Sequence, residues 1–298
     1  MTELKYKFTY DILCKIIFLK RQDLLKQLVA AILGLKLDSI KEFVVTNAEI
    51  PPEMVGKKFC RFDINMLVEG QWVSLEVQVD DQGDFPERTL YYWARSYSNA
   101  LNAKEIYMSL PRVVVISIVD FIMFDGGEYF SEFVLLEAKR HELLTDKMKM
   151  VYIELEKLPK EIDKSNELET LLSLFNARSE EDLSKLEEMK VPAVTQAIKT
   201  YREIVASPEF QELERMRADA RYGEASAIAN AIATTEESVN ARWTGVVAEK
   251  DAALADKDAA LADKDAAMAD QKAVLADQKA ALADKDAEIA RLRAQLNL

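Results

Sequence analysis

Hydrophobic and polar residues alternate along two neighbouring stretches of the chain, residues 58–68 and 71–79. Alternation with a period of two is typical of β-strands, and the Glu69-Gly70 dipeptide between the stretches is typical of a two-residue hairpin loop. With such a loop, residues that face each other have numbers adding up to about 139. The pattern predicts three facing pairs on the polar side of the hairpin: Asp63 with Glu76, Arg61 with Gln78, and Asn65 with Ser74.

Further helices are predicted where apolar residues recur every three or four positions, and further strands where short apolar runs are bounded by turn residues. The expected helices cover residues 9–20, 21–33 and 85–101, and the expected strands cover 42–48, 113–119, 130–136 and 150–155. Thr9 and Asp84 are suitable N-caps, and Gly34 is a suitable helix end. Residues 166–245 have a helical pattern, with breaks near Ser179, Pro192 and Pro208.

The facing pair Asp63 and Glu76 is unfavourable in a sheet that only has to be stable. Two carboxylates placed directly opposite each other, roughly 4.5–5.5 Å apart at Cβ, repel and weaken the pairing. A divalent cation removes this repulsion and prefers such oxygen ligands. The alternative is that the polar side of the hairpin is the solvent-exposed side of a half-buried sheet, and the pattern alone leaves both interpretations open.

The spacing of these residues also resembles a known family. Asp63, followed after twelve residues by Glu76-Val77-Gln78, resembles the core motif of PD-(D/E)XK nucleases, with Gln in place of the usual Lys. The succession of YDILCKIIF, DINMLVEGQWVSLEVQV, FPERTLYYWARSYSNAL and a strand beginning VVVISIV is similar to the bacterial recombination-promoting nuclease/putative transposase family. The resemblance covers residues 5–155. It implies an α/β (α+β) restriction-endonuclease-like core, with a mixed sheet flanked by helices.

The resemblance implies a metal-dependent DNA endonuclease that hydrolyses phosphodiester bonds. Asp63, Glu76 and the carbonyl of Val77 are then the ligands of Mg²⁺ or Mn²⁺, and Gln78 completes the catalytic motif. A neutral amide at position 78 can orient water or phosphate, but it supplies no positive charge. Asp11 is a further candidate, because related folds place an acid of the first helix near the metal; it could equally form a surface pair with Lys15.

Three basic residues are candidates for contact with DNA phosphates. Lys58 and Arg61 lead into Asp63, where they could also serve as charged edge residues that discourage aggregation. Arg88 lies on the predicted helix 85–101; the resemblance implies that this helix lies against the active sheet, from where Arg88 could reach a phosphate or a carboxylate. The net charge of −13 argues against tight non-specific binding to DNA without metal or local basic clusters.

The last 49 residues form a seven-residue repeat, which begins KDAALAD at Lys250. Alanines alternate in steps of three and four from Ala252 to Ala294, which is the spacing of a coiled-coil seam filled with small residues. The repeat predicts a long helix, with homo-oligomerisation through residues 250–298 as one outcome and a solitary helix as the other. No run is long and apolar enough for a membrane span or a signal peptide, so a cytoplasmic protein is expected.

We therefore expect three regions: a nuclease-like domain at 1–160, an acidic helical region at 161–245 and a heptad-repeat helix at 246–298. The leading hypothesis for function is the Mg²⁺-dependent endonuclease acting on DNA. The alternative is a catalytically weak or inactive nuclease-fold protein that binds or scaffolds and oligomerises through its C-terminal helix.

Overall fold

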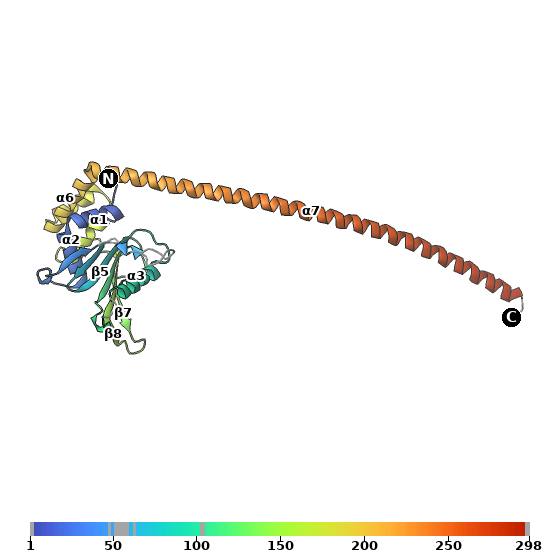
Figure 1. Ribbon diagram of the computed structural model, residues 1–298, viewed down its shortest axis with the longest axis horizontal. Helices are drawn as coiled ribbons and strands as arrows, with labels where there is room; N and C mark the ends of the chain where they lie inside the picture. The colour runs from blue at the N-terminus through green and yellow to red at the C-terminus, as the bar shows by residue number, and fades with distance from the viewer. Residues whose placement is uncertain (1–2, 47–48, 51–59, 62–63, 102–104, 296–298) are drawn as a thin grey trace. The chain divides into compact units, whose positions relative to one another are not determined.

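The computed structural model describes residues 3–46, 49–50, 60–61, 64–101 and 105–295 of the chain. The chain divides into two compact units, Met1–Leu213 and Glu214–Leu298. Helices cover both faces of a mixed sheet in the first unit, and the second unit is helical (Figure 1). This is the restriction-endonuclease-like α/β fold that the sequence predicts.

Within the described residues, a six-stranded mixed sheet forms the centre of the first unit, with the strand order β1-β4-β5-β6-β8-β7. Strands β5, β6 and β8 run parallel to one another. The remaining pairs, β1 with β4, β4 with β5 and β7 with β8, are antiparallel. The strands are β1 (Phe43–Thr46), β4 (Ile64–Val68), β5 (Gln71–Gln78), β6 (Val113–Val119), β7 (Phe130–Leu136) and β8 (Leu143–Glu154).

The β4–β5 hairpin has the predicted register over its described residues. Ile64 pairs with Leu75 and Asn65 with Ser74, so the facing numbers add up to 139 as expected. Both loop residues have positive φ angles, 48° at Glu69 and 72° at Gly70, as in the two-residue turns that match the twist of a hairpin. Asp63 itself lies outside the described residues.

The described part of the hairpin ends at the pair Ile64 and Leu75. Two short strands, β2 (Glu49–Ile50) and β3 (Cys60–Arg61), form a separate small sheet. Arg61 pairs there with Glu49. Gln78 pairs with Val119 of β6, which is the neighbour of β5 on the side away from β4. The expected pairing of Arg61 with Gln78 stays a prediction, because Val119 occupies only one side of Gln78 and residues 62–63 lie outside the described residues.

Two element boundaries differ from the prediction. The first helix begins at Asp11 with Tyr10 as its N-cap, while Thr9, the expected cap, is buried at 2% exposure. Strand β8 begins at Leu143 instead of residue 150, because its largely exposed first half, which mixes polar and apolar residues, pairs with β7 as a hairpin arm. A half-exposed arm lacks the unbroken apolar run by which its buried second half is recognised.

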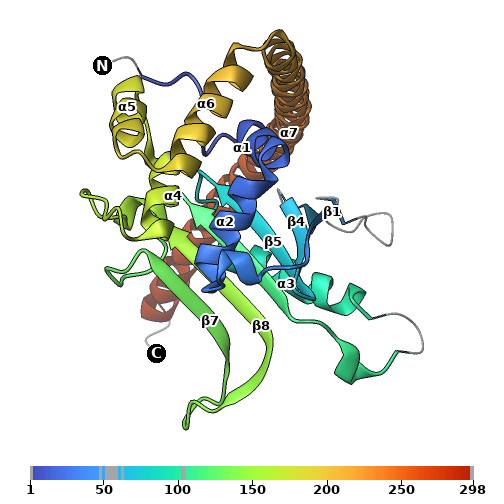
Figure 2. The same cartoon turned by 90° about the vertical axis from the view of Figure 1, so that its left-hand side faces the viewer.

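Two layers of helices cover the sheet (Figure 2). Helix α3 (Phe85–Asn99) lies on one face, where Phe85 packs against Val115 and Val119 of β6. The other face is buried in the main core under the remaining helices of the first unit. These are α1 (Asp11–Lys20), α2 (Gln22–Leu33), α4 (Glu167–Asn176), α5 (Glu180–Glu188) and α6 (Pro192–Ala206).

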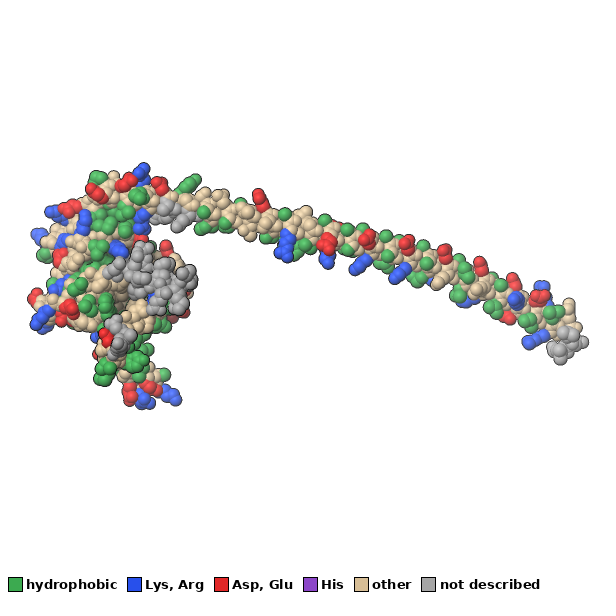
Figure 3. Space-filling model, viewed as in Figure 1, with side chains coloured by type: hydrophobic (Ala, Val, Ile, Leu, Met, Phe, Trp, Pro, Cys, Tyr) green, Lys and Arg blue, Asp and Glu red, His purple; other side chains and the backbone are tan. Residues whose placement is uncertain are grey.

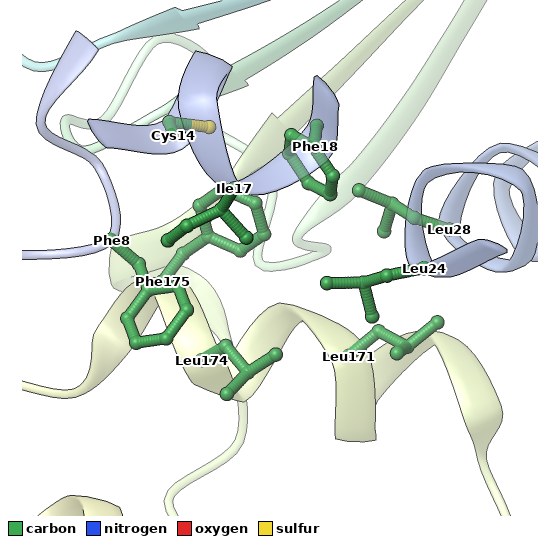
Figure 4. A pocket seen from close by; sticks show the side chains of 9 residues that line it. All are labelled: Phe8, Cys14, Ile17, Phe18, Leu24, Leu28, Leu171, Leu174 and Phe175. Atoms are coloured by element: carbon green, nitrogen blue, oxygen red, sulfur yellow. The ribbon is translucent and has the colours of Figure 1, made fainter. Parts of the chain in front are cut away.

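Apolar side chains dominate the helical layer of the main core. Figure 4 shows side chains of α1, α2 and α4 converging on a small void of about 10 Å³. A void of that size is at the lower limit for holding a single water, and the lining carries no strong polar group. Its residues are Phe8, Cys14, Ile17, Phe18, Leu24, Leu28, Leu171, Leu174 and Phe175. This apolar packing stabilises the fold, and the lining of the void carries no catalytic group.

The last helix, α7 (Pro208–Gln295), has 88 residues. At 1.5 Å per residue it would be about 132 Å long. The heptad-repeat helix predicted from Lys250 onward is therefore the end of one continuous helix. Charged and hydrophobic side chains alternate along its surface (Figure 3), and the large apolar side chains from Ile228 to Leu292 are exposed.

Candidate active site

Strand β5 supplies the centre of the candidate site. Val73, Leu75 and Val77 point into the main core, so Ser74 and Glu76 belong to the opposite face, which α3 covers. Ser74 is 4% exposed and Glu76 is 7% exposed. The interpretation of this polar face as the solvent-exposed side of the sheet is therefore wrong. A central strand with partners on both sides and helices over both faces has no wet side.

Glu76 forms an ion pair with Arg88 of α3. Nη2 of Arg88 lies 3.3 Å from Oε1 of Glu76. The guanidinium also stacks over the Phe85 ring at 4.9 Å and lies 3.4 Å from Oε1 of Gln82. Arg88 keeps one fifth of its side chain exposed, so it bridges a buried carboxylate and the protein surface.

Two polar residues continue this face across the parallel strands. Ser117 of β6 is the direct neighbour of Glu76, and Tyr152 of β8 is the direct neighbour of Ser117. The Tyr152 hydroxyl lies 2.5 Å from the hydroxyl of Thr89 on α3. Burial raises the pKa of Tyr152, and the negative charge of Glu76 raises it further. The site therefore has a row of hydrogen-bonding groups beside its carboxylate.

The sequence reasoning missed Ser117, Tyr152 and Thr89. A signal for Ser117 was present, since it is the single polar residue in the apolar run Val113–Val119. No comparable signal existed for Tyr152, because the register between parallel strands separated by a long connection is not written in a local pattern.

A second carboxylate lies at the carboxyl end of β6. Asp120 donates its backbone N–H to the carbonyl of Gln78 at 2.9 Å. Its side chain is 7% exposed, with Arg178 at 3.1 Å and Lys7 at 3.9 Å. The Asp120 carboxylate thus forms ion pairs with two basic side chains. Such contacts are typical of a structural carboxylate at the end of the sheet.

The other predicted site residues are placed as follows. Gln78 ends β5 and donates from its side-chain amide to the carbonyl of Asp80 at 2.9 Å. Val77 is buried within β5, and Asp11 is the exposed first residue of α1. Asp63 and Lys58 lie outside the described residues, and only the strand pairing of Arg61 is described. The structure thus brings Glu76 together with Arg88, while the roles of the other residues stay predictions.

Among the described residues, no group of three or more His, Cys, Asp or Glu side chains is arranged to hold a metal ion. Glu76 is the one predicted metal-binding side chain within that part of the chain. In the same part of the chain, no helix has the length and apolar content needed to cross a membrane.

The mixed sheet, its covering helices and the acidic residue on its central strand define a nuclease-like protein of the PD-(D/E)XK superfamily. A family model described as "PD-(D/E)XK nuclease family transposase" matches residues 10–231. Since the match covers more than half of the 298 residues, the chain belongs to this family. No curated protein and no solved structure matches the chain. The family resemblance predicted from the sequence is confirmed.

Proposed function

We propose that this protein is a metal-dependent DNA endonuclease of the recombination-promoting nuclease/putative transposase type. The observation that carries the proposal is the buried Glu76 on the central strand, paired in the expected register with the strand that follows Asp63. Continuing that register by one pair would bring Asp63 opposite Glu76. Membership in the nuclease family supports the same assignment.

The donor set fits Mg²⁺ or Mn²⁺. Asp63, Glu76 and the carbonyl of Val77 would supply hard oxygen ligands, and Mg²⁺ is usually held by one or two carboxylates plus water and substrate oxygens. When bound, the ion supplies an activated water and stabilises negative charge on the phosphate. Glu76 is a buried negative charge, and such an ion would neutralise it.

The chain's own residues then bind and orient the substrate. Arg88 neutralises Glu76 in the structure; with a cation on Glu76, its guanidinium could turn to a phosphate oxygen, which it can bind in bidentate fashion. Gln78 would orient water or phosphate through its amide. Lys58 and Arg61 would contact the DNA backbone, and Asp11 would assist from the first helix.

Cleavage of a linear plasmid tests this proposal. We expect cleavage with Mg²⁺ and none with EDTA. Asp63→Asn and Glu76→Gln should each lower the cleavage rate by at least about 100-fold, because changes around metal ligands alone typically cost 10–100-fold. Glu87→Gln is the matched control, since Glu87 is an exposed acid on α3 beside Arg88. Equal rates for Glu76→Gln and Glu87→Gln would contradict the proposal.

One observation favours the alternative of an inactive nuclease-fold binding protein. The Arg88 contact already compensates the charge of Glu76, and Gln78 supplies no cation in place of the motif's lysine. In that case DNA would bind without being cut. The plasmid experiment separates the two: DNA retained in a mobility shift but uncut in Mg²⁺ and Mn²⁺ supports the alternative.

We also propose that residues 250–298 associate with a second copy of the chain in parallel orientation. The alanine stripe of the repeat would form the seam, so the residues on either side of it decide the orientation. In a parallel pair these flanking residues give Lys272–Asp277, Lys279–Asp284 and Asp286–Arg291 contacts between copies. The first three repeats give only Asp–Asp contacts, such as Asp251–Asp256, so the attraction is confined to the later repeats.

Light scattering tests this association. We expect a dimer for the full chain and a monomer after truncation at Ala241. The double change Lys272→Glu and Lys279→Glu should also give a monomer, because it turns attractive pairs into repulsive ones. Lys257→Glu with Lys264→Glu is the matched control, since these lysines lie opposite the seam and should leave the dimer intact. The same oligomeric state for all four chains would contradict the proposed association.

A further inference from the structure

A pocket lined by polar side chains and a tryptophan lies near Glu76 on the same face of the sheet. Its volume is about 170 Å³, room for roughly five water molecules at about 30 Å³ each. Strands β1, β4 and β5 form one wall and the end of α3 forms the other. The lining residues are Thr46, Asn65, Trp72, Ser74, Ser96, Asn99 and Ala100.

The lining combines hydrogen-bonding groups with one large aromatic ring. The Ser74 hydroxyl donates to Oδ1 of Asn65 at 2.7 Å, and both side chains are buried. The Ser96 hydroxyl oxygen is buried and has no hydrogen-bond partner among the described residues. Trp72 keeps 37% of its surface exposed. A flat ligand with polar edges could stack on the indole and hydrogen-bond to the hydroxyl and amide groups.

The pocket is positioned next to the proposed site of phosphate cleavage. Ser74 precedes Glu76 by two residues on the same face of β5, which is about 6.6 Å along the strand. Asn65 lies on β4, directly opposite Ser74. A strand whose phosphate is bound by Arg88 beside Glu76 could therefore place a neighbouring base at the pocket.

We propose that this pocket takes an unpaired nucleobase of the nucleic-acid strand whose phosphate is bound by Arg88 beside Glu76. This inference rests on the proposed nuclease function and names its substrate class: a single strand or a locally opened duplex. A base inside an intact duplex cannot enter such a pocket, because it must first leave its stack and its partner. Stacking on an aromatic ring with hydrogen bonds to the exposed edge is how proteins hold an extruded base.

Binding measured in EDTA tests the pocket separately from cleavage. The probes are a fluorescent twelve-nucleotide single strand of mixed sequence, the same length of abasic sugar–phosphate strand, and the matching duplex. We expect the full-length protein to bind the ordinary strand about tenfold more tightly than the abasic strand or the duplex, the effect of about one stacked base.

Variants locate this preference in the pocket. Asn99→Phe fills the mouth from an exposed helix position, and Ser96→Leu fills the interior. Each should weaken binding of the ordinary strand about tenfold and leave binding of the abasic strand unchanged. Ser98→Phe is the matched control, because Ser98 is exposed on the same helix and is not part of the lining. Asn99→Phe keeps the test valid if Ser96→Leu fails to fold.

The outcomes separate the pocket from the nuclease activity. If Asn99→Phe removes the preference for the ordinary strand but the protein does not cleave with Mg²⁺, the pocket is supported and the proposed nuclease function is overturned. If the protein cleaves DNA and Asn99→Phe and Ser98→Phe bind the ordinary strand equally well, the nuclease function is supported and the proposed base pocket is overturned. Failure of the full-length protein to distinguish the ordinary strand from the abasic strand also overturns it.

Discussion

The contact between Glu76 and Arg88 provides the sharpest test of how the site works. Two unit charges 3.3 Å apart attract by about 5 kcal/mol at an effective dielectric constant of 20. The net contribution is smaller, because both groups lose water and one fifth of the Arg88 side chain is still exposed. We expect a coupling free energy of about 1–2 kcal/mol between the two side chains, within the range for residues in contact.

A double-mutant cycle in EDTA measures this coupling. Glu76→Gln keeps the shape of the side chain and Arg88→Met keeps its aliphatic length, so each removes mainly a charge. Each single variant should lower the free energy of unfolding by about 2 kcal/mol, because the remaining charge loses the opposite charge 3.3 Å away. The double variant should cost less than the sum of the two. For the 213-residue first unit, 1 kcal/mol corresponds to a Tm shift of about 2–4 °C.

Adding Mg²⁺ to the same cycle separates a metal ligand from a purely structural ion pair. At a concentration ten times its Kd, an ion that binds only the folded state adds about 1.4 kcal/mol of stability. The unmodified protein should gain this stability, Glu76→Gln should not, and Arg88→Met should gain more because no guanidinium competes for Glu76. Equal gains for all variants would refute Glu76 as a ligand. If Glu76→Gln is more stable than the unmodified protein in EDTA, the repulsion between carboxylates outweighs the Arg88 contact.

Two further predictions concern stability away from the site. Glu154 is fully buried, with Lys157 Nζ at 2.8 Å and the N–H groups of Met123 and Phe124 donating to its carboxylate. In urea unfolding, Glu154→Gln should therefore lower the free energy of unfolding by about 3 kcal/mol, whereas Glu156→Gln at an exposed position should leave it unchanged. Truncation after Ala241 should leave the Tm of the first unit unchanged in calorimetry, because α7 is exposed from residue 225 onward; a clear fall in Tm would show that the removed residues pack on that unit.

The hairpin shows what local sequence can specify. The Glu69-Gly70 loop and the alternation on both sides were enough to predict the β4–β5 register, because a two-residue turn leaves one way to pair the strands. The helices on either side of it were equally readable from their apolar spacing. The heptad repeat predicted a helix, which the structure shows continuing back to Pro208.

What covers the polar face could not be read in the same way. The expected repulsion between Asp63 and Glu76 took no account of Arg88, whose guanidinium lies 3.3 Å from the Glu76 carboxylate. Arg88 lies on a helix whose position over the sheet is a tertiary property. The parallel neighbours Ser117 and Tyr152 likewise depend on connections of many residues, so no local rule fixes which residue lies beside Glu76.

The position of β5 has a consequence for the dynamics of the protein. The strand has a hydrogen-bonded neighbour on each side and little exposed surface. Backbone amides in such a strand exchange with solvent chiefly when the whole domain unfolds, since no smaller opening exposes them. Glu76 is therefore carried by the slowest-opening part of the chain. A ligand that binds there meets a backbone that is already rigid, so little conformational entropy is lost on binding.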